Sequence, residues 1–127
     1  MNLKALLPLS AVALLGMASA LPAAPAAPGP DGAMLFRQRC AGCHTVVPGA
    51  RGVIGPNLSG LVGRKAASTT FTYSPALKAS KLVWNRANLD RYLTAPNKLV
   101  PGTRMVIAVS DAKQRAAILD FLAKPTK

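Results

Sequence analysis

The stretch from residue 45 to residue 63 limits the possible folds of this chain more than any other part of the sequence. Seven of its residues are glycine or proline, namely Pro48, Gly49, Gly52, Gly55, Pro56, Gly60 and Gly63. These residue types favour turns and interrupt helices and strands, and a loop longer than about 12–15 residues is uncommon inside a compact domain. The chain therefore needs something large and apolar at its centre, against which such loops can hold their shape.

Three segments are predicted to form helices, because each has a capping residue followed by apolar side chains at helical spacing. The predicted caps are Asp31, Asn88, and either Ser110 or Asp111. The first helix is expected to run to about Cys40, and the second to end before Pro96. The apolar side chains are, in chain order, Met34, Leu35, Phe36, Leu89, Tyr92, Leu93, Ile118, Leu119, Phe121 and Leu122. No long run alternates between apolar and polar residues, so an all-α domain with long loops is predicted.

The first thirty residues differ in composition from the rest of the chain. Residues 1–20 carry one lysine, an apolar run and then Ala18-Ser19-Ala20, a pattern typical of a cleaved secretory signal peptide. A membrane anchor is the alternative, but the run is shorter than the roughly 20 apolar residues that span a bilayer. Residues 21–30 contain four prolines and are expected to form a stiff linker. The folded domain is then expected over residues 31–127.

The sequence Cys40-Ala41-Gly42-Cys43-His44 matches the C-x-x-C-H motif for haem attachment. Two thiols at this spacing can add to the two vinyl groups of one porphyrin, and the next residue places an imidazole over the iron. One covalently bound haem c is therefore predicted, and it would supply the large apolar centre that the loops require. Three alternatives compete. Structural zinc needs four ligands, a thioredoxin-like dithiol needs a strand and a helix around it, and a simple disulfide leaves the loops unexplained.

Few side chains of this sequence can ligate the iron. His44 is the single histidine of the chain and the expected proximal ligand. Once a signal peptide is removed, Met34 and Met105 are the two remaining methionines. Met34 lies on the predicted first helix and cannot readily reach the opposite face of the haem. Met105 lies in a loop and is the expected sixth ligand, since histidine and methionine together are a known ligand pair of haem iron. A role as core filler is the alternative for Met105.

From Gly32 to Leu122 the chain resembles class I cytochrome c of the mitochondrial and related bacterial kind. The shared blocks are F-x-x-x-C-x-x-C-H at 36–44, GPNLSGLVGRK at 55–65, FTY at 71–73, Trp84, and YLTAPNKLVPGTRM at 92–105. The spacings between the blocks match as well, so the resemblance covers nearly the whole predicted domain. It implies the class I cytochrome c fold, in which helices and loops wrap around one covalently bound haem c and leave one edge near solvent.

The resemblance also implies roles for residues around the haem. It implies that the Pro56 carbonyl accepts a hydrogen bond from His44 Nδ1–H, which raises the donor strength of the imidazole. It implies further that Arg64, Tyr73 and Trp84 hydrogen-bond a haem propionate, because a buried carboxylate demands donors. Without the family, these residues are a turn proline, a solvated arginine and two core aromatic residues.

Two more haem contacts and one structural contact follow from the same resemblance. Tyr92 is expected near the sixth ligand, and Thr103 is expected to bond the inner propionate. Gly32 and Phe36 are expected to meet Phe121 where the terminal helices cross. The sequence departs from the usual family residues at Leu77, Asn97, Ile107, Asp111 and Ala112. These departures leave the reduction potential and the choice of partner open.

The charge of the chain indicates what kind of surface it meets. Sixteen Lys and Arg residues stand against four Asp and Glu, which is a formal charge of +12 and favours an acidic partner. Arg39, Lys98 and Arg104 flank the motif or the ligand loop and are expected around the exposed haem edge. Nucleic acid binding is disfavoured, because an export signal is present and no basic recognition motif is found.

The sequence thus predicts a periplasmic one-electron carrier rather than an enzyme. It is expected to be a monomer that docks on redox proteins with acidic surfaces and meets a membrane only through a membrane-bound redox complex. Two alternatives stay open. One is a haem c subunit fixed in a larger oxidoreductase, and the other is a peroxidase or gas sensor with an open distal site.

Overall fold

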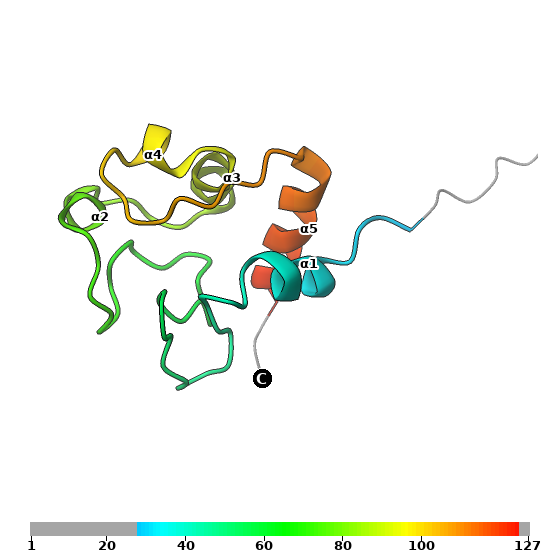
Figure 1. Cartoon of the computed structure of the whole chain (residues 1–127), viewed down its shortest axis with the longest axis horizontal. Coiled ribbons are helices and arrows are strands. Elements are labelled where there is room, and N and C mark those ends of the chain that lie inside the picture. The colour runs from blue at the N-terminus through cyan, green and yellow to red at the C-terminus, as the bar shows by residue number, and fades with distance from the viewer. Residues whose placement is uncertain (1–27, 125–127) are drawn as a thin grey trace, which may run out of the picture.

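The computed structural model describes residues 28–124. In this part of the chain the helices are α1 (Gly32–Arg39), α2 (Pro75–Ala79), α3 (Arg86–Thr94), α4 (Pro96–Leu99) and α5 (Ala112–Leu122) (Figure 1). The described residues contain no strand, and one isolated antiparallel bridge joins Lys65 and Val83. The predicted all-α class is confirmed. None of the helices within residues 28–124 is long and apolar enough to span a bilayer. The predicted signal peptide and most of the predicted linker lie outside the described residues.

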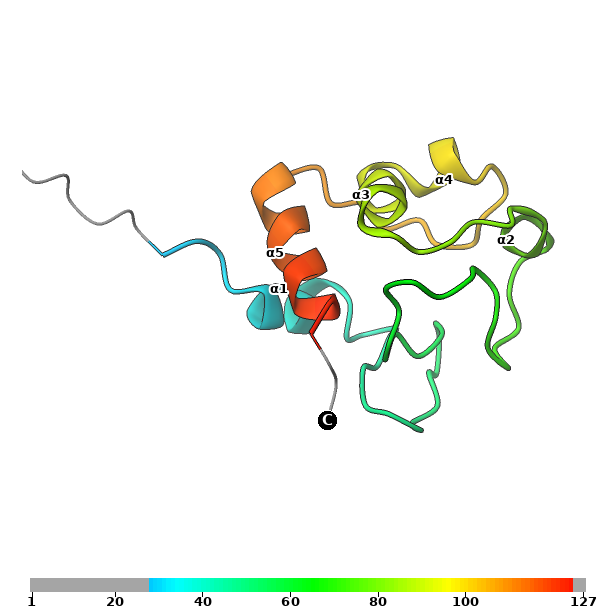
Figure 2. The same ribbon diagram turned by 180° about the vertical axis from the view of Figure 1, so that it is seen from behind.

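The terminal helices α1 and α5 pack directly against each other (Figures 1 and 2). A Cβ atom placed on Gly32 would lie 2.0 Å from the Ala117 carbonyl oxygen and 3.0 Å from Phe121 Cβ, so the approach requires a glycine. The rings of Phe36 and Phe121 pack with centroids 5.2 Å apart. The expected meeting of Gly32, Phe36 and Phe121 is confirmed, and Ile118 next to it is fully buried.

The capping residues test the helix boundaries predicted from the sequence. Asp31 accepts hydrogen bonds from the first amides of α1, and Asp111 caps α5, so both predictions are confirmed. The prediction for Asn88 is wrong, since Asn85 is the N-cap of α3 and accepts a bond from the Asn88 amide at 2.8 Å. Asn88 instead lies in the first turn and donates its side-chain amide to the Val83 carbonyl at 2.8 Å. The apolar spacing begins only at residue 89 and therefore conceals the first turn of the helix.

Two short helices were not expected from the sequence. Ser74 caps α2 by accepting a bond from the Leu77 amide at 3.1 Å, and Pro75 occupies its first turn, where a proline has no amide to leave unpaired. Pro96 begins α4 in the same way, directly after α3 ends at Thr94 as predicted. Both helices are too short to show an apolar period, so only their Pro residues indicate them.

The side chain of Asn57 makes several of the hydrogen bonds that hold the long loop of residues 45–63. Asn57 Nδ2 donates to the carbonyls of Val47 and Ala50, each at 2.7 Å, while Asn57 Oδ1 accepts from the Ser59 amide at 2.7 Å. No helix or strand forms there, as predicted. The side chain of Asn57 therefore substitutes for the regular backbone bonds that the Gly and Pro residues prevent.

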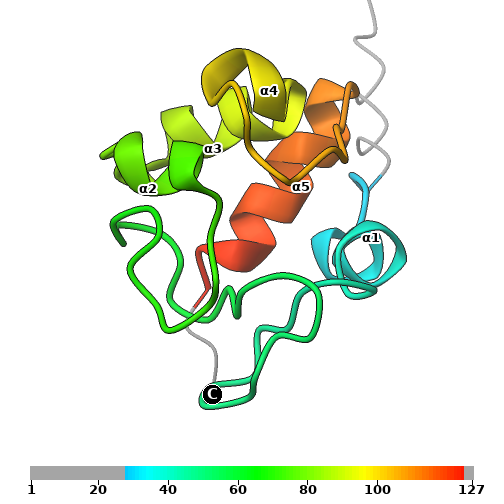
Figure 3. The ribbon, with the colours of Figure 1, turned by 60° about the vertical axis from the view of Figure 1, so that its left-hand side comes forward.

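The helices and the loops occupy different sides of the molecule. Figure 3 shows α2, α3 and α4 gathered on one side and the long connection between α1 and α2 on the other. The segment of residues 100–111, here called the methionine loop, returns along α3 on the side that faces this connection (Figures 1 and 2). Val109 fixes that course, because its amide donates to the Leu93 carbonyl at 2.8 Å.

Candidate haem site

The attachment motif forms a tight turn at the end of α1. Cys40 is the C-cap of α1, and the amides of Cys43 and His44 both donate to the Cys40 carbonyl, at 3.0 and 2.9 Å. Both cysteines are free, Cys40 partly buried and Cys43 exposed. Burial raises the pKa of the Cys40 thiol, and the neighbouring Arg39 charge opposes this effect. Cys40 is therefore a protonated thiol at neutral pH, ready to add to a vinyl group.

The His44 ring is fixed by a contact on each of two sides. Its Nδ1 lies 2.8 Å from the Pro56 carbonyl oxygen, and since a carbonyl can only accept, Nδ1 carries the proton. Nε2 keeps its lone pair and is free to ligate a metal. Gly55 backs the ring so closely that a Cβ there would lie 2.5 Å from His44 Cε1. The Gly55 amide donates to the Cys43 carbonyl at 2.9 Å. This bond connects the residue behind the ring directly to the attachment motif.

The methionine loop carries Met105 towards the apolar core. Met105 is partly buried and packs against the core cluster, whereas Met34 on α1 is 49% exposed. Two hydrogen bonds hold the two residues that directly precede Met105. Thr103 pairs its hydroxyl with Tyr92 at 2.5 Å inside the core, and Arg104 donates to the Thr72 carbonyl at 3.2 Å.

The residues expected to bind the propionates differ in whether their side chains already form hydrogen bonds within the protein. Arg64 donates to the carbonyls of Asn57 and Ser59, each at 2.9 Å, and the Tyr73 hydroxyl pairs with Thr69 at 2.5 Å. The buried indole of Trp84 donates to no group in the described part of the chain.

Trp84, Tyr92 and Thr103 lie together in the core. The rings of Trp84 and Tyr92 have centroids 5.0 Å apart, and the Tyr92 hydroxyl pairs with Thr103, which the resemblance assigns to the inner propionate. Burial raises the pKa of Tyr92, and the bond to Thr103 partly offsets this rise. Tyr92 therefore keeps its proton in neutral solution.

These residues fit a haem and do not fit a metal ion bound by side chains alone. Among residues 28–124, no three His, Cys, Asp or Glu side chains lie close enough together to hold a metal, which removes the zinc alternative for this part of the chain. Two free thiols on one turn, an imidazole with an available Nε2 and an indole N–H with no hydrogen-bond partner among the described residues are features that a covalent porphyrin can use.

The sequence and the fold also match known proteins. The family described as Cytochrome c matches residues 30–125. This chain belongs to the cytochrome c family. It is 44% identical over 98 residues to cytochrome c of Stellaria longipes, which covers 76% of this chain and 91% of that protein. Cytochrome c2 of Rhodoblastus acidophilus is 46% identical over 77 residues, or 60% of this chain and 72% of that protein.

A solved structure supports the same assignment. Cytochrome cH from Methylobacterium extorquens aligns with a TM-score of 0.66 and 38% identity, over 72% of this chain and 92% of that one. The class I cytochrome c fold expected from the resemblance is confirmed. A cytochrome c carries a covalently attached haem c, and Cys40 and Cys43 occupy the positions of the attachment motif in this chain. Family membership also supports a role in electron transfer with redox proteins as partners.

Two side chains that organise this cytochrome c fold were not singled out from the sequence. Asn57 closes the long loop, and its place in the Gly-Pro-Asn run of residues 55–57 is the local signal that indicates it. Arg115 is buried at 9% exposure and bonds the methionine loop. No local pattern marks Arg115, because its ion-pair partner Asp90 lies 25 residues away on α3.

Proposed function

We propose that this cytochrome is an exported one-electron carrier whose haem iron is ligated by His44 and Met105. The observation that carries the proposal is the His44–Pro56 hydrogen bond at 2.8 Å, which reserves Nε2 for the iron. Met105 is favoured as the second ligand because it is half-buried on a held loop, whereas Met34 is 49% exposed on α1. In this role the haem would supply a one-electron couple, and His44 and Met105 would be the residues that hold its iron.

The ligand set explains why a carrier is favoured over an enzyme. Two protein ligands leave no coordination position for a substrate, and side chains held on both faces keep the rearrangement on electron transfer small. A thioether ligand and a dry pocket both favour the reduced state. The reduction potential is therefore expected to be positive.

A visible and near-infrared spectrum of the ferric protein tests this ligation. A weak near-infrared band from the thioether–iron bond is expected in the native protein and should disappear in Met105→Ala. That variant should also have a lower potential and a new peroxidase activity, because it opens a coordination position. Met34→Ala is the matched control and should keep the band. A native protein without the band, or a Met105→Ala spectrum like the native one, contradicts the ligation.

A strongly basic surface is the basis for proposing acidic redox partners. The chain has four acidic side chains. Each of them either caps a helix or forms an ion pair. Asp31 and Asp111 cap α1 and α5, and Asp90 and Asp120 form ion pairs at 2.8 and 2.7 Å. Most of the basic side chains therefore face solvent without an opposing charge.

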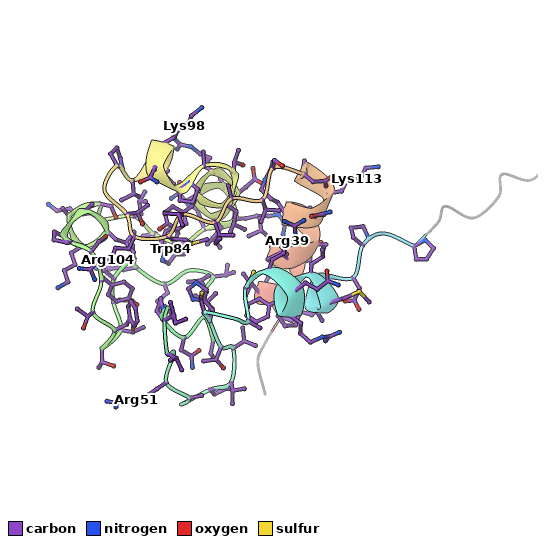
Figure 4. All side chains as sticks on the ribbon, viewed as in Figure 1. Arg39, Arg51, Trp84, Lys98, Arg104 and Lys113 are labelled. Carbon is purple, nitrogen blue, oxygen red and sulfur yellow. The ribbon has the colours of Figure 1, made fainter. Side chains whose placement is uncertain are left out.

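The charges proposed for docking lie beside the motif and the methionine loop. Figure 4 shows Arg39 and Arg104 towards opposite ends of the face in view, with Arg51, Lys98 and Lys113 projecting at its outline. Arg39 directly precedes Cys40. Electron-transfer encounters are small, usually below about 1,200 Å², and gain more rate from steering than from contact area. We therefore place the docking face on the surface beside the attachment motif and the methionine loop, where Arg39 and Arg104 lie.

Salt and charge reversal test the docking face. The screening length is about 10 Å at 0.1 M salt, so the reaction with an acidic partner should slow steeply as salt rises through that range. Arg39→Glu should slow it further at low salt, while Lys81→Glu, an equal charge change between α2 and α3, should have less effect. Rates that ignore salt, or equal effects of both reversals, would show that the charge does not direct docking.

Export is proposed from residues 1–20, and intact mass tests it. The mature protein is expected to begin near Leu21, after Ala18-Ser19-Ala20. An exported protein that still contains Met1 would contradict this processing. Purification of the exported protein without other chains is the result expected of a free carrier, whereas stable co-purification would favour a fixed subunit.

A further inference from the structure

Arg115 is the charged member of the buried core, with 9% of its surface exposed. Its guanidinium group joins three segments of the fold. Nε donates to Asp90 Oδ1 on α3 at 2.8 Å, and Nη1 donates to the carbonyls of Val109 at 3.0 Å and Ser110 at 2.7 Å. Arg115 itself stands in the first turn of α5. One side chain thus ties the end of the methionine loop to α3 and to α5.

The remaining bonds of the methionine loop show what this attachment does. Before the ligand position, the loop is attached through Thr103 to Tyr92 and through Arg104 to Thr72. After it, the next attachment is at Val109, whose amide donates to Leu93 and whose carbonyl accepts from Arg115. Within the described part of the chain, residues 105–108 make no hydrogen bond of their own. Met105 therefore lies on a span whose C-terminal end is held at residues 109 and 110.

We infer that Arg115 is a positioning residue for Met105, and that it keeps the thioether in place by anchoring the far end of the methionine loop. The inference rests on the proposed His44/Met105 ligation. Arg115 makes no contact with the ligand itself and acts through Val109 and Ser110. Val109 is 2% exposed, so its carbonyl has little access to water if the guanidinium is removed.

Loss of this anchor should make the loop open more often. A soluble ligand such as imidazole can reach the iron only when Met105 has left. Its apparent affinity is therefore proportional to the fraction of molecules in which the loop is open. A variant that opens more easily must bind imidazole more tightly. Imidazole affinity therefore reports on the loop, and global unfolding does not.

The structure provides a matched control for Arg115. Arg86 also joins α3 to α5, through its bond to Asp120 at 2.7 Å, but none of its bonds reaches the methionine loop. Arg86→Met therefore removes an arginine and an ion pair between the same two helices. It leaves the anchor at residues 109 and 110 intact.

The experiment titrates imidazole into the ferric holoproteins and follows the near-infrared thioether band. Arg115→Met should bind imidazole at least about tenfold more tightly than the native protein, since one hydrogen bond from a charged donor is worth that factor. Arg115→Lys, which keeps a charged donor but cannot bond all three acceptors in the same way, should show a smaller increase. Arg86→Met should match the native affinity within about twofold, as expected for an exposed ion pair.

Three outcomes would overturn the inference. Native-like imidazole affinity in both Arg115 variants would show that the loop is held without Arg115. An equal rise in Arg115→Met and Arg86→Met would show that helix packing alone controls the ligand. If Arg115→Met yields no holoprotein, the comparison of Arg115→Lys with Arg86→Met decides in the same way. A native protein without the thioether band contradicts the ligation first, and the inference with it.

Discussion

Replacing Gly55 with alanine tests how the protein holds His44, the proposed ligand of the haem iron. Gly55 is buried directly behind the ring of His44. An alanine Cβ there would lie 2.5 Å from Cε1, 2.7 Å from Nδ1 and 3.0 Å from Nε2 of that ring. Because ordinary contacts begin at 3.4 Å, the ring or the backbone has to move by about 0.9 Å.

Either movement breaks a hydrogen bond of the site. If the ring moves, the 2.8 Å contact from Nδ1 to the Pro56 carbonyl can lengthen beyond the hydrogen-bond range of about 3.2 Å. If the backbone moves, the 2.9 Å bond from the Gly55 amide to Cys43 is stretched instead. Overpacking costs about 1–3 kcal/mol, and a lost hydrogen bond costs about 1 kcal/mol more. The free energy of unfolding should fall by about 2–4 kcal/mol.

Denaturant unfolding of the holoprotein measures this change, with Gly42→Ala as the control. Gly42 lies inside the attachment motif, yet a Cβ on it meets nothing within 4 Å. Both variants gain the same restriction of the unfolded chain, worth about 0.4–1 kcal/mol, so their difference isolates the clash. If Gly55→Ala unfolds at the same denaturant concentration as Gly42→Ala, the close contact between Gly55 and the His44 ring does not orient the ring.

Three further results are expected. Cys40→Ala should leave a single thioether bond, and mass spectrometry of the denatured protein should still find haem attached, though less of it. Gly32→Ala places a Cβ 2.0 Å from the Ala117 oxygen and should lower the free energy of unfolding by about 1–3 kcal/mol. Burial raises the pKa of Tyr92 above its usual 10.0, so the fold favours the protonated phenol. That stability is present below pH 10.0 and should be lost as the pH rises through the raised pKa. Thermal unfolding across the alkaline range should show this loss in the native protein, and Tyr92→Phe should reduce it.

Features that depend on neighbours in the chain could be predicted from the sequence. The C-x-x-C-H motif, the caps Asp31 and Asp111, and the absence of regular structure over residues 45–63 all follow from side chains within a few positions of one another. The resemblance extended this to the fold class and to the expected contact between Phe36 and Phe121. The prediction failed at Asn85, because the first turn of α3 has no apolar residue to reveal it.

The contacts that hold the ligands were decided by the tertiary structure. Arg115 and Asp90 are 25 residues apart in the chain, and Arg104 reaches Thr72 across 32 residues. A lone arginine in sequence is most often solvated, since its charge is costly to bury without partners. Only the packing of α5 beside α3 places the Asp90 carboxylate beside Arg115. Local chemistry thus indicated where a haem can be attached, and long-range packing determined how the methionine loop is held.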